Sequence, residues 1–294
     1  STVATVGDDL TPSSSLVVSA TSVPAGITVT DLTNSGGNVT AKVAATCGAT
    51  LGANTIGLQV TDGAGLGSTA SLIVNVTRET TPPVITLNGA DTMTVECRVG
   101  FTDPGASATD NCAGGVPVTV SGGVNTSVPG SYTLTYTATD GRNTATRTRT
   151  VNVVDTSAPQ LTLKPAISLW PPDHRHHTVT VAQMVESAGD GCNTTLGISS
   201  VVIERVTSDE PDNAPGDSDG NTTQDIVIGA DCKSVQLRAE RDERKNGRVY
   251  TVTLRARDAS GNTTRQEFKV SVPIGQSSPA VQDAAMLTKT SSCP

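Results

Sequence analysis

The sequence predicts an all-β protein made of several β-sandwich domains, and three observations support this class. Only 2% of the 294 residues are aromatic and 35% are hydrophobic, which supplies several small cores better than one large core. Apolar and polar residues alternate with period two in recurring stretches, as expected for strands with one buried face. The 28 glycines and 16 prolines separate these stretches as turn residues do.

A repeated hairpin pattern organises the chain. Three stretches align without gaps up to an acidic turn, namely NTIGLQVTDGAG from Asn54, YTLTYTATDGRN from Tyr132 and YTVTLRARDASG from Tyr250. Each is followed by a glycine-containing turn and a second alternating stretch, which is typical of a β-hairpin. Modules of about 80 residues with several short strands and no helical periodicity indicate β-sandwiches.

The aspartates that end these stretches are Asp62, Asp140 and Asp258. We expect them to begin the hairpin turns by accepting hydrogen bonds from nearby backbone N–H groups. In an alternative interpretation, Asp62 or Asp140 lies near a domain junction and shares a calcium ion with Glu79 or Asp155.

The second strand of the middle hairpin departs from the pattern. Arg149 stands where Leu72 and Phe268 occupy the equivalent apolar positions. This difference predicts an edge strand or a weakly buried strand at Arg149.

Proline-led segments mark the boundaries between repeats. TRETTPPVITL follows the first hairpin and VVDTSAPQLTL follows the second, as expected of short semi-rigid linkers. The predicted domains are residues 1–79, 80–156 and 157–276, followed by a C-terminal tail, 277–294. The first domain lacks a proline-led first strand, and the third carries about 40 extra residues relative to the repeat spacing.

Charge and hydropathy exclude two classes of function. The formal net charge is −8, which argues against nucleic-acid binding because that function needs a basic face. No apolar run approaches the roughly 18 residues of a membrane span. No signal peptide is visible, so Ser1 is expected to be a mature N-terminus or a cut within a longer protein.

The six cysteines contain no CxxC pair, and in a chain of this composition they indicate disulfides and an oxidising, extracellular setting. Their grouping along the chain predicts Cys97–Cys112 and Cys192–Cys232, with loops worth about 3 and 4 kcal/mol in the chain-entropy model. Cys47 and Cys293 are left over. They pair with each other, pair between chains or stay free.

Several motifs carry a resemblance to known modules. The middle segment has TPPVI at its start, the cysteine pair of VEC and FTDPGASATDNC, and the hairpin YTLTYTATD. With these features it resembles the bacterial immunoglobulin-like and hyalin-repeat modules of secreted proteins over nearly all of residues 80–156. The third segment is similar to a module often found beside such repeats, through LWPPDH, the acidic SDEPDN and GDSDG, and NGRVYTVTLRARDASGN. The first segment resembles a further bacterial immunoglobulin-like repeat.

The resemblance implies extracellular, non-catalytic spacer or adhesion modules. The full expectation is therefore three tandem immunoglobulin-like β-sandwich domains in an elongated arrangement, secreted or on the bacterial cell surface.

All three histidines lie in LWPPDHRHH, residues 169–177. If a strand begins at His174, then His174 and His176 share one face and could supply two metal ligands, with His177 on the other face. Zinc catalysis would need a third protein ligand and an open position, and the sequence offers no second histidine cluster. The favoured interpretation is a domain entrance shaped by Trp170 and the adjacent prolines.

The acidic stretch SDEPDNAPGDSDGNTTQD is the better metal candidate. Asp217, Asp219, Asn221 and Asp225 fall at relative positions 1, 3, 5 and 9, and oxygen ligands on such a loop suit calcium. The stretch is not an EF-hand, because its glycine is at position 4 and Ile228 is at position 12. The alternative is a solvated acidic loop without a metal.

Two further charged groups have simpler interpretations. Asp103, Asp110 and Asn111 lie beside the predicted middle disulfide and are read as turn residues, with ligation as the alternative. The run RAERDERKNGR, residues 238–248, is read as a solvated hairpin with exposed ion pairs.

The predicted function is a non-catalytic structural or adhesion segment, stiffened by disulfides and by calcium where calcium binds, with other subunits or cell-surface components as partners. One alternative is a self-assembling filament joined by strand addition. In that case the tail 277–294 complements the first domain of another copy, and Cys47 and Cys293 lock the contact. A second alternative is a set of carbohydrate- or ligand-binding modules attached to an enzyme outside this chain. The sequence has no GxSxG motif, and no enzyme is predicted.

Overall fold

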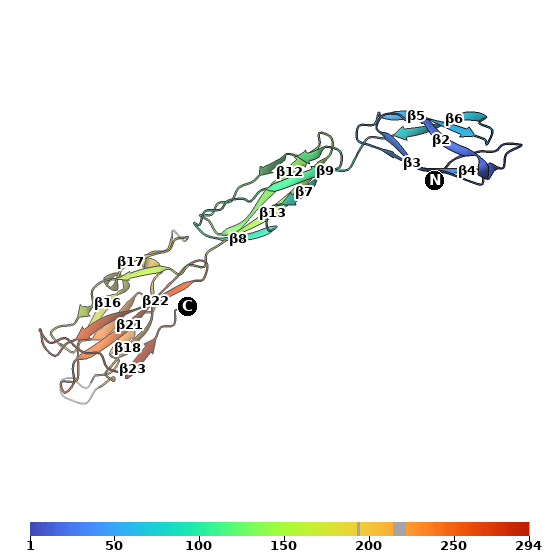
Figure 1. Ribbon diagram of the computed structural model, residues 1–294. Coiled ribbons are helices and arrows are strands. Elements are labelled where there is room, and N and C mark those ends of the chain that lie inside the picture. The colour runs from blue at the N-terminus through green and yellow to red at the C-terminus, as the bar shows by residue number, and fades with distance from the viewer. Residues whose placement is uncertain (193–194, 214–221, 294) are drawn as a thin grey trace. The chain divides into compact units, whose positions relative to one another are not determined.

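The computed structural model describes residues 1–192, 195–213 and 222–293. Its secondary structure is almost entirely β-strand (Figure 1). The described residues contain a single α-helix, the four-residue α1 (Val181–Met184), and two 3-10 turns (Ser13–Ser15 and Ile198–Ser200). Among these residues, none of the helical segments has the length and hydropathy needed to cross a membrane.

The first segment consists of two three-stranded sheets, ordered β1-β4-β3 and β2-β5-β6. Its buried core is small and centres on Ile27, Ala49, Ile56 and Leu58. The strands are β1 (Thr2–Thr5), β2 (Val17–Ser22), β3 (Ile27–Ser35), β4 (Asn38–Ala45), β5 (Gly52–Thr61) and β6 (Gly67–Val76).

The middle segment also consists of two sheets, ordered β10-β9-β7 and β11-β12-β13-β8. Strand β8 runs parallel to the C-terminal half of β13, from Thr92↔Thr150 to Glu96↔Val154. The strands are β7 (Val84–Leu87), β8 (Thr92–Glu96), β9 (Ala106–Asp110), β10 (Gly114–Val116), β11 (Val118–Ser121), β12 (Gly130–Thr139) and β13 (Thr144–Val154).

The third segment has the largest core, which spans a five-stranded sheet, β15-β22-β21-β18-β23, and a three-stranded sheet, β16-β20-β19. The same segment also contains a two-stranded sheet, β14-β17. The strands are β14 (Gln160–Leu163), β15 (Ile167–Ser168), β16 (His176–Thr180), β17 (Val185–Gly189), β18 (Val202–Ser208), β19 (Ile226–Ile228), β20 (Ser234–Arg238), β21 (Arg248–Arg257), β22 (Thr263–Val272) and β23 (Leu287–Thr290).

The predicted fold class, tandem immunoglobulin-like β-sandwiches, is confirmed. The chain forms two compact units that divide the middle segment between them. The first unit contains Ser1–Asp91, Asp103–Gly122 and Leu134–Arg149, and the second contains Thr92–Thr102, Gly123–Thr133 and Thr150–Pro294. The predicted domain limits at residues 79, 156 and 276 stay a prediction.

The repeated hairpins are present where the sequence predicts them. In the first, β5 pairs with β6 in antiparallel register up to Thr61↔Gly67, and in the third, β21 pairs with β22 up to Arg257↔Thr263. Strands β12 and β13 are neighbours in their sheet. The period-two alternation therefore identifies the paired strands correctly.

The expectation for Arg149 is wrong, because this residue is fully buried and β13 is an inner strand between β12 and β8. Its guanidinium group is tolerated there because its N–H groups find acceptors and its Cζ atom lies 5.4 Å from the centroid of the Tyr136 ring. The acceptors are the Asp103 carboxylate, the Tyr136 hydroxyl and the carbonyl oxygens of Asn88, Ala90 and Gly105.

The Asp103→Asn variant should lower the free energy of unfolding of the middle segment by about 3 kcal/mol at neutral pH, because it leaves a buried guanidinium group without its counter-charge. Burial raises the pKa of Asp103, but the hydrogen bonds from Tyr136 and Gly105 and the charge of Arg149 outweigh burial and hold it below 3.8. The stabilising effect of Asp103 is therefore present above pH 3.8 and is lost as the pH falls through the lowered pKa.

The measurement is hydrogen–deuterium exchange of β12 and β13 peptides in the two proteins, at pH 7 and at pH values below 3.8. Asp91→Asn is the control, because its ion pair with Arg147 is exposed and should be worth less than about 1 kcal/mol. Equal protection of β12 in Asp103→Asn and the wild type at pH 7 would contradict the prediction.

Candidate functional site

Two of the three disulfides join successive segments of the chain, and the third closes a loop within the third segment. They are Cys47–Cys112, Cys97–Cys192 and Cys232–Cys293, with Cα–Cα distances of 5.2, 6.0 and 6.4 Å. The predicted pairs Cys97–Cys112 and Cys192–Cys232 are therefore wrong. The three alternatives for Cys47 and Cys293 are wrong as well, because each pairs with another cysteine of this chain.

Strand length explains why Cys97 and Cys112 do not pair. The N–H of Cys97 donates to the carbonyl of Val154, at the C-terminal end of β13. Cys112 follows β9 and lies by Asp110 and Asp140, at the turn that precedes β13. An eleven-residue strand is about 36 Å long, and disulfide-bonded Cα atoms lie within about 7 Å of each other.

The tail accounts for the third pair. Strand β23 lies antiparallel to β18 at the edge of the five-stranded sheet, with Ser208↔Leu287 in register. This pairing brings Cys293 to Cys232, in the turn between β19 and β20. The tail thus completes a sheet of its own chain, and the predicted complementation of the first domain of another copy is not what this structure contains.

The turn prediction for the three repeated aspartates is confirmed. Asp62 Oδ1 accepts from the N–H groups of Ala64 and Leu66, each at 2.9 Å. Asp140 Oδ1 accepts from Arg142 and Asn143 at 2.7 and 2.6 Å, and Asp258 Oδ1 accepts from Asn262 at 2.8 Å. The backbone N–H of Asn143 is the main reason that the pKa of Asp140 lies below its usual value.

The second and third of these turns also hold the linker that precedes their segment. Asn143 Nδ2 donates to Glu79 Oε2 at 3.2 Å and to Asp140 Oδ2 at 3.0 Å. Asn262 Nδ2 donates in the same way to the carbonyl of Asp155 at 3.0 Å and to Asp258 Oδ2 at 2.9 Å. Each junction therefore combines a disulfide with a turn asparagine that binds the linker.

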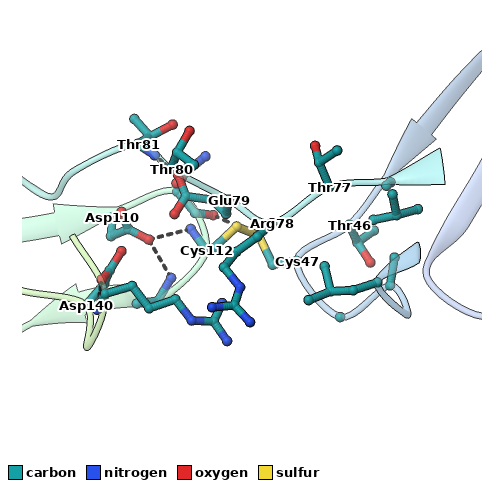
Figure 2. A pocket seen from close by; sticks show the side chains of 18 residues that line it. Thr46, Cys47, Thr77, Arg78, Glu79, Thr80, Thr81, Asp110, Cys112 and Asp140 are labelled. Carbon is teal, nitrogen blue, oxygen red and sulfur yellow. Dashed lines mark hydrogen bonds between the residues drawn. A yellow bond between two sulfur atoms is a disulfide. The ribbon is translucent and has the colours of Figure 1, made fainter.

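At the first junction three carboxylates converge beside the Cys47–Cys112 disulfide (Figure 2). One oxygen each of Glu79, Asp110 and Asp140 lies within 4.8 Å of the others. They line an open cavity of about 710 Å³ that also contains Arg78 and Arg142. This acidic cluster is the strongest candidate for a binding site among the described residues.

The Asp110 carboxylate is the most buried member of this cluster, with 8% of the residue exposed. Its Oδ1 accepts from the N–H groups of Cys112 and Ala113, both at 2.8 Å. Its Oδ2 is buried and has no hydrogen-bond donor among the residues that the structure describes. The turn interpretation of Asp110 is confirmed, and it leaves one oxygen available for another partner.

The second junction has several hydrogen bonds in addition to the Cys97–Cys192 disulfide. Asp155 Oδ2 accepts from the Ser260 hydroxyl at 3.0 Å, and Glu96 accepts from the N–H and hydroxyl of Thr156, both at 2.9 Å. The N–H of Thr156 is the largest cause of the lowered pKa of Glu96. Asp155 and Asp190 lie near the sulfur of Cys192, which is bonded to Cys97 and therefore is not a metal ligand.

The histidines do not form a common site. Strand β16 begins at His176 and not at His174, whose φ of 59° places it in the left-handed region. His176 Nε2 is 2.9 Å from the carbonyl of Gln224, and His177 Nε2 is 3.0 Å from Asp173 Oδ1. Trp170 is 40% exposed beside them. These separate partners agree with the structural interpretation of LWPPDHRHH.

Most of the predicted calcium loop cannot be assessed, because Asp217, Asp219 and Asn221 lie outside the described residues. Asp225 is described and is fully buried, with its Oδ2 2.5 Å from Arg248 Nη1 and its Oδ1 3.3 Å from Arg238 Nε. Its carboxylate thus already serves an internal ion pair. Calcium binding at this loop stays a prediction.

The run 238–248 is not the solvated hairpin that the sequence indicates. Glu240 and Arg248 are fully buried, and Asp242 is 6% exposed. They belong to a polar cluster in which Glu210 Oε2 accepts from the N–H of Asp242 at 2.7 Å and from Arg248 Nε at 3.2 Å. The charges of this connection between β20 and β21 look solvated in the sequence, because some of their partners, such as Glu210, come from distant segments.

Of the interpretations drawn from the sequence, the alternative that places Asp140 beside Glu79 agrees best with the observed junction. Asp140 does lie with Glu79, whereas Asp62 serves its own turn. The third member, Asp110, is adjacent in sequence to Asn111 and Cys112. Its role in the cluster depends on the Cys47–Cys112 pairing, which the sequence spacing does not reveal.

Comparison with known proteins adds a family for the middle segment. A family model described as bacterial surface protein, Ig-like domain, matches residues 85–153. A search of the curated proteins found no match.

Solved structures similar to the chain include cadherin repeats of low identity. The protocadherin gammaB7 EC3-6 cis-dimer is 18% identical over 88% of this chain and 66% of that chain, just under two thirds of its length, with a TM-score of 0.35. Mouse protocadherin-24 EC1-3 is 13% identical over 94% of this chain and 93% of that chain, with a TM-score of 0.32. Human CDH23 EC21-23 is 15% identical over 87% and 88%, with a TM-score of 0.35.

The family match covers the hairpin and most of the strands that the sequence motifs single out in the middle segment. Residues 85–153 are therefore similar to the bacterial surface immunoglobulin-like domain.

Proposed function

We propose that the chain is a non-catalytic structural segment of a bacterial cell-surface or extracellular protein, in which disulfides hold each immunoglobulin-like module to the next. The observation that carries this proposal is the pairing of Cys47 with Cys112 and of Cys97 with Cys192. A disulfide within a module stabilises that module only. One between modules restricts the linker that joins them, and thereby fixes the spacing that a stalk or adhesion segment must maintain.

The linkers themselves support this role. The first contains Pro82 and Pro83 and the second contains Pro159, and proline restricts the backbone of the residue before it as well as its own. Each linker is also hydrogen-bonded to the hairpin turn that follows it, through Asn143 or Asn262. The partners of such a segment would be other subunits or components of the cell surface.

The other functions considered from the sequence have less support. A filament joined by strand addition needs a free tail, but β23 pairs with β18 of the same chain and Cys293 pairs with Cys232. The histidines that an enzyme would use have separate backbone and carboxylate partners.

Small-angle X-ray scattering tests the proposal. The oxidised chain should fit a single conformation, whereas a variant with Cys47→Ser, Cys112→Ser, Cys97→Ser and Cys192→Ser should require an ensemble of conformations. The control is Cys232→Ser with Cys293→Ser, which removes a disulfide of the third segment and should leave the scattering curve within error of the wild type. Identical curves for all three proteins would contradict a role in fixing the junctions.

A further inference from the structure

We propose that the acidic cluster at the first junction, Glu79, Asp110 and Asp140, is a calcium-binding site. The inference goes beyond the proposed function, because it assigns a ligand to this junction that the disulfides do not require. It differs in place from the calcium loop predicted around Asp217 and Asp219, and it adds the buried Asp110 to the Asp140–Glu79 alternative that the sequence offers.

The buried oxygen of Asp110 is the first argument. A carboxylate oxygen that is removed from water and accepts no hydrogen bond is costly, and such groups in proteins usually have a partner. Asp110 Oδ2 is in this position among the described residues, while Oδ1 of the same group is fixed by two backbone N–H groups. The group is thus held in place with one oxygen unsatisfied, as a metal ligand would be.

The geometry of the three carboxylates is the second argument. Their oxygens lie within 4.8 Å of one another. Oxygen atoms this close together can contact one calcium ion, whose ligands lie about 2.3 to 2.6 Å from the metal. Calcium also tolerates irregular coordination, and the open cavity beside the cluster has room for the water molecules that complete it.

The local charges are the third argument. Three carboxylates repel one another, and Asn143 is the only described side chain that donates to two of them, Glu79 and Asp140. Asn143 is neutral. Arg78 and Arg142 line the same cavity, but no ion pair within the described residues joins either of them to the cluster. A divalent cation bound between the three carboxylates would offset their mutual repulsion directly.

The second junction provides a comparison within the same chain. Its acidic group contains Asp155, Asp190 and the disulfide-bonded Cys192, and the Asp155 carboxylate accepts from Ser157 and Ser260. It therefore offers two carboxylates where the first junction offers three. We expect one junction to bind calcium and the other to rely on hydrogen bonds.

Isothermal titration of the full oxidised chain with calcium chloride, after treatment with EDTA, tests the site. Asp110→Asn and Glu79→Gln should each weaken one binding component at least tenfold, because each removes a charge and keeps a side-chain carbonyl oxygen as a hydrogen-bond acceptor. Asp62→Asn is the matched control, since Asp62 accepts turn N–H groups in the same way in the β5–β6 turn. The calcium affinity of this variant should stay within twofold of the wild type.

Two further measurements keep the outcomes distinct. The titrations are repeated with Asp217→Asn and Asp219→Asn present, so that binding at the acidic loop is not counted as binding at the junction. Peptide mapping confirms that Cys47–Cys112 forms in every variant. If Asp110→Asn fails to fold, Glu79→Gln on the linker tests the site in its place.

No heat in the wild type at millimolar calcium, or unchanged calcium binding in both variants, would overturn the proposal. The scattering comparison is made in EDTA, where no calcium is bound. It therefore tests the structural function independently of the calcium site.

Discussion

Stretching the oxidised chain between its termini should stop at about 360 Å, whereas the reduced chain should extend to about 1,000 Å. The difference follows from the way two of the disulfides interlock, because Cys97 lies between Cys47 and Cys112 in the sequence. The shortest covalent path from end to end follows residues 1–47, 112–97, 192–232 and 293–294, about 102 steps of at most about 3.6 Å each. All other residues are shielded from the applied force.

Single-molecule force spectroscopy measures this length directly, and disulfide variants shift it by known amounts. Removing Cys97–Cys192 lengthens the path to about 167 steps, or about 580 Å, and removing Cys47–Cys112 lengthens it to about 137 steps, or about 480 Å. The pairing that the sequence suggests, Cys97–Cys112 with Cys192–Cys232, would instead leave about 238 steps, or about 820 Å. A limit near that value in the oxidised wild type would show that the modules are not joined by disulfides.

The interlocked arrangement also makes the junctions more resistant to opening under load. In the chain-entropy model, loops of 65 and 95 residues are each worth about 4 to 5 kcal/mol, although overlapping loops are not additive. A module pulled from either end cannot separate from its neighbour while the bridge between them is intact. This is the mechanical property that a spacer or adhesion stalk requires.

The sequence predicts the strands of this protein better than it predicts their connections. Period-two alternation locates the hairpins β5–β6, β12–β13 and β21–β22, because each strand buries one face and the turn residues between them are local signals. The aspartate turns are likewise encoded within four residues. Local physical chemistry is sufficient for both.

The disulfides and the junction cluster depend on which strand ends meet, and that is a property of the folded chain. Cys97 and Cys112 are near each other in sequence but lie at opposite ends of β13. Glu79, Asp110 and Asp140 are far apart in sequence and meet because the linker, the β9–β10 turn and the β12–β13 turn share one end of the segment. The sequence repeat predicts only that Glu79 and Asp140 lie near each other, and it does not predict that Asp110 joins them.

The alternation of apolar and polar residues also fails to predict that arginines are buried. Arg149 and Arg248 are both fully buried, although their strands look polar at these positions. Each stacks near a tyrosine, with 5.4 and 5.6 Å between the guanidinium carbon and the ring centroid. Burial of a charge is possible only when distant segments supply acceptors, and no local pattern reports those acceptors.

The substitution Arg248→Met should lower the free energy of unfolding of the third segment by about 3 to 5 kcal/mol at pH 7, because it removes the cation beside Glu210 and one of the two cations beside Asp225. Arg248 Nη1 is 2.5 Å from Asp225 Oδ2, and Nε is 3.2 Å from Glu210 Oε2. Asp225 is 0% exposed and Glu210 is 1% exposed. Methionine fills much of the volume of arginine, so the cost would come mainly from the loss of charge.

The pH dependence separates this explanation from a simple packing defect. Burial already raises the pKa of Glu210 above 4.5, although the N–H of Asp242 and the Arg248 charge oppose the rise. Loss of Arg248 raises that pKa further, so the ionised carboxylate of the variant becomes a larger penalty as the pH rises through it. The difference between variant and wild type should therefore be largest at neutral pH and should shrink as the pH falls toward 4.5.

Trp170, the only tryptophan of the chain, reports unfolding of this segment by fluorescence in urea. Arg265→Met is the control, because the Arg265 side chain is half exposed in its pair with Glu204 and should contribute less than about 1 kcal/mol. Adding Glu210→Gln to Arg248→Met should recover part of the loss at pH 7, since it removes one of the uncompensated charges. A loss that is independent of pH and is not reduced by Glu210→Gln would mean that Arg248 stabilises the segment by packing alone, and that the buried charges are not the reason for its position.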